Sequence, residues 1–346
     1  MSHRIKAVAA GKKSAAIHRD APIAPAWPSY QGTSQFVGTS PSGRVTVYVD
    51  PMLGQDGLQN AQDLVDDADR VVAANDAIFG TVGGPVSVIV FALGGNTDGG
   101  GGADHMGCDY TTGAAIEVCA SFGNSMRVSA LFEAELSECS MNGSLCGLST
   151  GEALSRWCAA VIGNNVLPDF ATAPQWAQDG MPNYVDQTDP TDQGADSTGC
   201  GMAFISWLMS QSYGLDKIAQ AMVAAGDAGT FALLYATLTS DAESNAWPNF
   251  LNAIQALPNG VDSDDPFAGA SQLVQLPGFT VWTATMAGNV FAAIFEDIAA
   301  GKSAEQIVAS VQAALFPAPA ARSATEAMSS CQPKSKRLRP PSRKSA

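Results

Sequence analysis

The stretch most informative about chemistry is residues 123–143, GNSMRVSALFEAELSECSMNG, because a glutamate stands there among apolar residues. At about 100° per residue, one side of a helix over this stretch carries Glu135 together with five apolar side chains, which are Val128, Leu131, Phe132, Leu136 and Cys139. Glu138 falls at the edge of this side, and Glu133 points the other way. A carboxylate in apolar surroundings is costly unless it meets a metal or a hydrogen-bond donor, or keeps its proton. Glu135 is therefore the first candidate functional residue.

The elements that must position this helix are strands and helices of the first half of the chain. Apolar, β-branched runs predict strands at 44–50, 85–93 and 114–122, and an amphipathic pattern predicts a helix at 57–79. The glycine-rich stretch 94–107 lacks the ending of a phosphate-binding loop, so we expect a mobile loop there.

The second half of the chain is helical in pattern. It starts with Ser149 and Glu152, which have the spacing of a capping box, and it includes a predicted helix at 198–214. Strands followed by helices predict an α+β fold, with a small mixed sheet in the N-terminal part and a mostly helical C-terminal half.

Composition divides the chain into four parts. Residues 1–43 are rich in Pro, Ser and Gly, and we expect them to be disordered. One main domain is expected over 44–258, followed by a polar linker. A helical hairpin extension is expected over 266–316, and a basic disordered tail over 317–346.

Charge is distributed unevenly and excludes one class of partner. Between residues 40 and 321 there are six basic residues against thirty-one acidic ones, a net charge of −25. Such a surface repels the phosphates of nucleic acids, so we expect no DNA or RNA partner for this part. No apolar run approaches the roughly 18 residues that a membrane-spanning helix needs, so we expect no membrane span.

Seven cysteines are present, and six lie within residues 108–200. An even cluster favours disulfides and an extracellular or exported protein, although spacing leaves the pairing open. The start of the chain lacks the apolar segment of a secretory signal, so no export route is recognisable. The disulfide candidates are Cys108, Cys119, Cys139, Cys146, Cys158 and Cys200.

Three elements follow one another along residues 44–257. The first element is a strand, an antiparallel edge strand and the glutamate-bearing helix. The second is the motif P-x-W-x-x-[DE]-G-x-x-x-Y, which is matched by Pro174, Trp176, Asp179, Gly180 and Tyr184. The third element is a helix ending L-x-x-x-Y-G, matched by GMAFISWLMSQSYG at 201–214. This series resembles the zincin-like metallopeptidases of the gluzincin type, and it implies a zincin-like domain over 44–258.

In that family the helix carries HExxH, in which two histidines bind zinc and the glutamate is the general base. In this chain the motif reads Ala134-Glu135-Leu136-Ser137-Glu138, so an alanine stands at the first ligand position. The resemblance implies Glu135 as the catalytic base and Glu138 as the second metal ligand. It also implies Asp179 as the third metal ligand.

The same resemblance implies that Ala134, Trp176 and Tyr184 support or line the cleft. Without imidazoles on the helix, the implied ligands are all oxygens, which suit calcium, magnesium or manganese better than zinc. His105, in the glycine-rich stretch, is a further candidate for a nitrogen ligand. A divalent cation is thus the one cofactor to consider.

Three hypotheses of function remain open. In the first, a degenerate metallopeptidase-like protein lacks zinc-dependent peptidase activity and binds a peptide or protein in the former active-site cleft. In the second, an active hydrolase, peptidase or glycosidase-like, uses a carboxylate site of Glu135, Glu138 and Asp179. In the third, the helices form a structural or effector scaffold.

Each candidate residue also has a structural explanation. Glu135 would then accept hydrogen bonds from Tyr184 or Arg156, and Glu138 would be an exposed residue at the edge of the helix. Asp179 would cap a helix that begins at Gly180. Trp176 and Tyr184 would be packing residues. Convergence of the carboxyl groups in space is what separates these explanations from a functional site.

Overall fold

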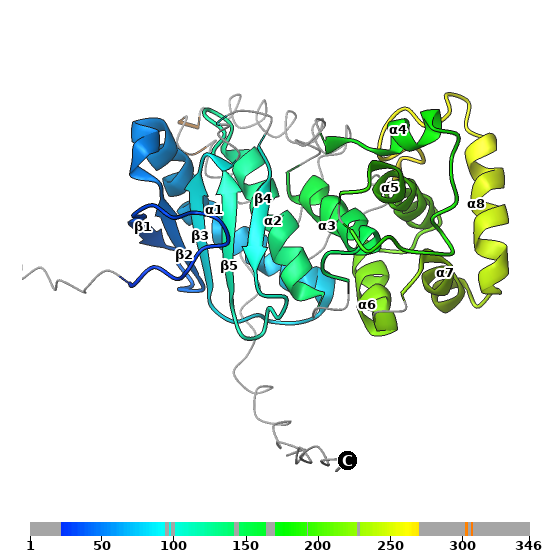
Figure 1. Ribbon diagram of the computed structural model, residues 1–346, viewed down its shortest axis with the longest axis horizontal. Coiled ribbons are helices and arrows are strands. Elements are labelled where there is room, and N and C mark those ends of the chain that lie inside the picture. Colours follow the sequence, from blue (N-terminus) through cyan, green and yellow to red (C-terminus); the bar gives the residue numbers. More distant parts are fainter. Residues whose placement is uncertain are drawn as a thin grey trace, which may run out of the picture. The chain divides into compact units, whose positions relative to one another are not determined.

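The computed structural model describes residues 22–269 apart from 94–96, 98–100, 142–144, 164–169, 192 and 227–228, together with residues 302, 303 and 306. The chain divides into two units at residues 292 and 293. All structural statements below concern the first unit. It combines a five-stranded sheet with helices (Figure 1), which confirms the predicted α+β class.

The sheet has the strand order β1-β2-β3-β5-β4. The strands are β1 (Gln35–Thr39), β2 (Val45–Val49), β3 (Val86–Phe91), β4 (Ala103–Met106) and β5 (Ala114–Cys119). The three central strands, β2, β3 and β5, run parallel, whereas β1 and β4 pair antiparallel at the two edges. The sheet is therefore mixed, and β4 is one of its edges.

Both faces of the sheet are covered, which explains why apolar residues of its central strands point to either side. On one face, Val47, Val88 and Ile116 belong to the main core together with α1 (Gly54–Phe79) and α2 (Ser125–Ser140). On the other face, Tyr48 and Ile89 form a smaller core with Trp27 from the segment before β1.

The segment that covers the second face lies within the part predicted to be disordered. Glu117 on β5 is buried and accepts hydrogen bonds from the backbone N–H groups of Ser29 and Tyr30, at 2.9 and 2.6 Å. The Ser29 hydroxyl donates a third, at 2.7 Å. The predicted disorder of residues 1–43 is therefore wrong for 22–43, where β1 and this docked segment lie. Residues 1–21 lie outside the described part.

The helical half consists of α3 (Ser149–Ile162), α4 (Ala173–Gln178), α5 (Ala195–Ser210), α6 (Leu215–Ala225), α7 (Phe231–Thr239) and α8 (Ala246–Gln255). Short 3-10 turns precede α1 (η1, Pro51–Leu53) and α8 (η5, Glu243–Asn245). Helix α3 packs on α2 and on α5, so it joins the sheet layer to the helical half. Helix α5 is buried along nearly its whole length, as expected of a helix that is apolar all round.

The predicted capping box at the start of α3 is not observed. Leu148, not Ser149, precedes the first turn of α3, and the Ser149 hydroxyl accepts a hydrogen bond from the backbone of Asp189. The predicted capping box is wrong, which leaves Glu152 available for other contacts. Most of the predicted hairpin at 266–316 and all of the predicted tail at 317–346 lie outside the described residues. None of the described helices is both long and apolar enough to cross a bilayer.

Candidate functional site

Helix α2 carries the two predicted acids of the site. The helix follows β5 directly, and the Asn124 side chain accepts a hydrogen bond from the Arg127 backbone N–H at 3.2 Å, which caps its first turn. Glu135 and Glu138 are three residues apart, so they lie on one side of the helix. Glu138 is buried, and Glu135 is half-buried.

The most deeply buried acid of α2 is Glu133. Its exposed fraction is 0%, and neither carboxylate oxygen has a hydrogen-bond partner within the described part of the chain. Burial raises the pKa of Glu133 well above its usual value. The prediction that Glu133 points away from the core is wrong, because α2 packs against α1 and the sheet as well as against α3.

A histidine from the sheet edge reaches the carboxylates of α2. His105 lies on β4, and its Nε2 is 3.3 Å from Glu138 Oε2. Its other nitrogen, Nδ1, is 2.9 Å from the carbonyl oxygen of Gly107 and 3.4 Å from the sulfur of Cys139. The glycine-rich stretch predicted as a mobile loop therefore ends in strand β4, and this strand holds the imidazole in place.

The contact with Glu138 sets the charge of both partners. Burial of His105 favours its neutral form, but the neighbouring Cys139 and Glu138 outweigh this and raise its pKa to about 11. Burial opposes ionisation of Glu138 as well, yet the hydrogen bond from His105 lowers its pKa. At neutral pH the two residues form an imidazolium–carboxylate pair.

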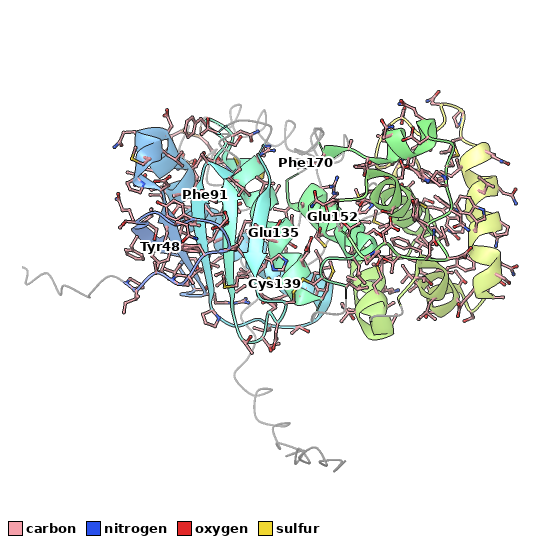
Figure 2. All side chains as sticks on the ribbon, viewed as in Figure 1. Tyr48, Phe91, Glu135, Cys139, Glu152 and Phe170 are labelled. Carbon is pink, nitrogen blue, oxygen red and sulfur yellow. A yellow bond between two sulfur atoms is a disulfide. The ribbon has the colours of Figure 1, made fainter. Side chains whose placement is uncertain are left out.

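A third acid, Glu152, enters the cluster from α3. Glu152 shares a hydrogen bond with Glu138. Burial raises the pKa of Glu152 to about 7, because it outweighs the opposing charge of Arg156 and the charge of Glu138 adds to it. Glu138 also accepts a hydrogen bond from the Ser155 hydroxyl at 3.2 Å. Figure 2 shows Glu135 and Cys139 on α2 and Glu152 on the neighbouring α3.

Glu135 completes the cluster as a protonated acid. Burial raises its pKa well above the usual value, and the neighbouring carboxylate of Glu138 adds to the effect. One ligand atom each of His105, Glu135 and Glu138 lies within 4.8 Å of the others. An imidazole nitrogen and two carboxylate oxygens are ligands that manganese and related divalent cations accept.

Asp179, the third ligand implied by the resemblance, is not part of this cluster. It lies at the C-terminal end of α4, where its Oδ2 accepts a hydrogen bond from Gln175 at 2.6 Å. It neither caps a helix starting at Gly180 nor belongs to a metal-capable group among the described residues. His105, rather than Asp179, is the residue that lies beside Glu135 and Glu138.

The other predicted residues have structural surroundings. Trp176 is fully buried, stacks on Phe250 with ring centroids 5.9 Å apart, and donates from Nε1 to the Pro182 carbonyl at 2.8 Å. Tyr184 is half-buried and packs against the main core, and Ala134 is half-buried on α2. In the described part, Glu135 accepts no hydrogen bond from Tyr184 or Arg156; Arg156 pairs with Glu152 instead.

The cysteine cluster contributes one disulfide, Cys108–Cys146. The other four candidates are buried and lie outside this disulfide: Cys119, Cys139, Cys158 and Cys200. The prediction of disulfides is confirmed for one pair, and the other four cysteines form no disulfide.

No protein-family model matches this sequence, and no curated protein or solved structure matches it either. The group of His105, Glu135, Glu138 and Glu152 is hereafter called the carboxylate–histidine cluster.

Proposed function

We propose that this protein binds a divalent cation through His105, Glu135 and Glu138 and is a metal-dependent hydrolase of metallopeptidase-like architecture. The observation that carries the proposal is the convergence of one nitrogen and two carboxylate oxygens within 4.8 Å. These atoms come from an edge strand and a helix that are separated in the chain by β5. His105 on β4 thus supplies an imidazole, whereas the motif on the helix contains none.

The orientation of His105 favours this use. Because Nδ1 faces the Gly107 carbonyl at 2.9 Å, the proton of a neutral ring belongs on Nδ1. The lone pair of Nε2 then points towards Glu138. A backbone carbonyl that fixes the tautomer of a metal-binding histidine is a common feature of metal sites.

Glu152 is suited to handle a proton beside the cation. A cation bound here would acidify a water molecule and polarise a carbonyl group. With a pKa of about 7, Glu152 can accept a proton and return it at neutral pH. Its pairing with Arg156 holds the carboxyl group in a fixed direction.

The position of the cluster supports the metallopeptidase-like part of the proposal. An antiparallel edge strand, β4, precedes the helix with the two acids, as the resemblance implies, although the parallel strand β5 lies between them in the chain. Asp179 has no role in the proposed site. We therefore assign the third ligand to His105 and the acid–base role to Glu152.

One observation favours a second candidate function, a peptide-binding protein without catalysis. The imidazolium of His105 already neutralises the carboxylate of Glu138, so the cluster is balanced in charge with no cation bound. Strand β4 is also a sheet edge, and such edges accept an extended peptide as an additional strand. In this case the cluster would fix the edge strand on α2.

Calorimetric titration with MnCl₂ separates the two candidates. We expect the wild-type protein to bind one manganese ion, and Glu138→Gln to weaken this binding by at least about tenfold because a charged ligand is lost. Asp179→Asn, the matched control on another helix, should bind as tightly as the wild type. Equal binding by all three proteins, or no binding by the wild type, would contradict the hydrolase proposal and leave the peptide-binding candidate.

A further inference from the structure

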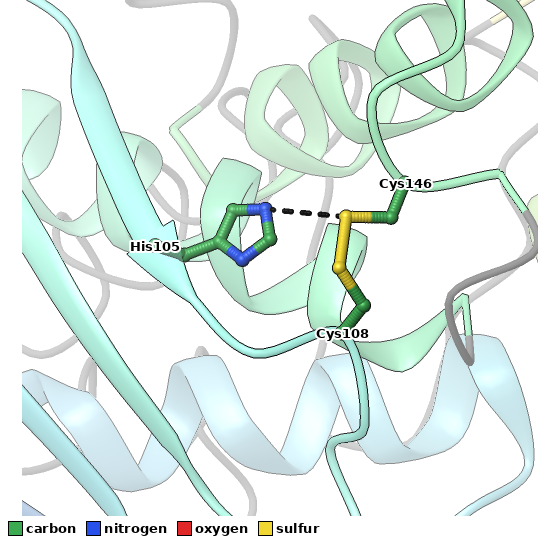
Figure 3. A group of neighbouring side chains, drawn as sticks. All are labelled: His105, Cys108 and Cys146. Carbon is green, nitrogen blue, oxygen red and sulfur yellow. Dashed lines mark hydrogen bonds between the residues drawn. A yellow bond between two sulfur atoms is a disulfide. The ribbon is translucent and has the colours of Figure 1, made fainter. Parts of the chain in front are cut away.

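The disulfide Cys108–Cys146 lies directly beside the histidine of the cluster. Cys108 follows β4 by two residues, and Cys146 precedes α3, so the bond ties the edge strand to the connection between α2 and α3. The sulfur of Cys146 is 3.6 Å from His105 Nε2 (Figure 3). The bond therefore occupies the space that the imidazole faces.

The same three residues form a second metal-capable group. His105, Cys108 and Cys146 place one nitrogen and two sulfurs within 4.8 Å of one another, although the two sulfurs are bonded to each other. One imidazole and two thiolates are a ligand set that zinc accepts, with a fourth position left for another group. Glu138 Oε2 lies 3.3 Å from the same Nε2 and is close enough to be the fourth ligand.

The spacing of Cys108 and Cys146 and the orientation of His105 are compatible with a zinc site that contains two thiolates. Two sulfurs on one tetrahedral zinc lie roughly 3.8 Å apart when the Zn–S bonds are about 2.3 Å long. Freed thiols on residues whose Cα atoms are 6.4 Å apart reach this spacing by rotation of their side chains. The Gly107 carbonyl and Cys139 sulfur contact Nδ1, so Nε2 is the nitrogen that faces the two cysteines.

We propose that reduction of the Cys108–Cys146 disulfide creates a zinc site formed by Cys108, Cys146 and His105. A dithiol reductant supplies two electrons and two protons, the S–S bond breaks into two thiols, and the reductant leaves as its own disulfide. Zinc then binds the thiolates, and their two protons pass to solvent. Because His105 serves both sites, the redox state decides between a cation site rich in oxygen and a thiolate zinc site. This last point rests on the proposed function.

Cobalt is a suitable probe, because Co²⁺ takes the place of Zn²⁺ and its bonds to thiolates absorb light by charge transfer. The full-length protein is compared oxidised and after reduction by a phosphine that is removed under nitrogen. We expect the reduced protein to bind one Co²⁺ with a sulfur-to-cobalt absorption that added Zn²⁺ abolishes. The oxidised protein should show no such absorption.

Variants identify the ligands. Cys108→Ser and Cys146→Ser should each lose the absorption in the reduced state, whereas Cys158→Ser, a control at a buried free cysteine on α3, should keep it. An absorption that survives in either of the first two variants would overturn the proposal, and so would its absence from the reduced wild type. Near-ultraviolet circular dichroism checks the fold, and a reduced protein that stays unfolded with zinc present would also overturn the proposal.

Failure of this inference is distinguishable from failure of the proposed function. Glu135→Gln should weaken manganese binding by the oxidised protein but leave the cobalt–sulfur absorption of the reduced protein unchanged, because Glu135 is not in the thiolate group. Manganese binding without the cobalt signal would refute only the redox-dependent zinc site. The cobalt signal without manganese binding would refute only the proposed function.

Discussion

Glu133→Gln is expected to raise the free energy of unfolding by as much as about 3 kcal/mol at pH 7, while having little effect near pH 4. Glu133 is fully buried without a hydrogen-bond partner in the described part of the chain, and burial raises its pKa well above the usual value. In the folded protein the side chain therefore keeps its proton at neutral pH. Glutamine imitates that neutral form at every pH.

The stability difference depends on pH because Glu133 has different pKa values in the folded and the unfolded chain. Below the pKa of the unfolded chain, both states hold the proton, and Glu133 imposes no penalty. Above it, only the unfolded chain ionises, so the wild type loses about 1.4 kcal/mol for each pH unit until the pKa of the folded state is reached. Urea unfolding of both proteins from pH 4 to pH 8 measures the difference. A glutamine variant that is less stable at pH 7 would show that the carboxylate is ionised and paired in the folded protein.

Trp176→Ala is expected to lower the free energy of unfolding by about 4 kcal/mol, because a large buried side chain is lost and a cavity remains. Trp176 is fully buried, stacks on Phe250 and donates a hydrogen bond to Pro182. Urea denaturation measures the loss. Manganese affinity should not change under conditions in which the variant is folded, since Trp176 lies outside the carboxylate–histidine cluster.

The control for this prediction is Tyr184→Phe. Tyr184 is half-buried and its hydroxyl donates no hydrogen bond in the described part, so its loss should change stability by no more than about 0.5 kcal/mol. If Trp176→Ala kept its stability but lost a ligand, the tryptophan would line a cleft, as the resemblance implies. That outcome would contradict its assignment to the core.

The central strands and the longest helix were predictable from local pattern. Runs such as VTVYV and VSVIVF combine β-branched and apolar residues, and the observed β2, β3 and β5 lie within the predicted ranges. The docking of residues 22–34 was not predictable, because Pro and Ser in that segment gave no periodic signal. Its order depends on Trp27 and on the buried Glu117, which lie ninety residues apart.

The burial of the acids of α2 was predicted only in part, for a physical reason. Helical periodicity assumes one buried side, but α2 contacts α1, the sheet and α3, so most of its residues are buried. The pattern places Glu135 and Glu138 on the buried side correctly, but it places Glu133 on the wrong side. A local motif contains no information on how many neighbours a helix will have.

The remaining members of the site depend on tertiary contacts. His105 was a candidate only because it is the single histidine between residues 22 and 269, and its strand brings it to Glu138. The sequence predicts Glu152 as a capping residue, and its spacing of four residues from Arg156 is the one local signal of the ion pair that forms instead. Asp179 matched a motif whose position in space the sequence did not determine.

The most direct test of the cation site is a crystal of the oxidised protein soaked in MnCl₂ and measured for anomalous scattering of manganese. The account predicts one strong anomalous peak within bonding distance of His105 Nε2 and of carboxylate oxygens from Glu135 and Glu138. A peak at Asp179, or none between the histidine and the two glutamates, would contradict it.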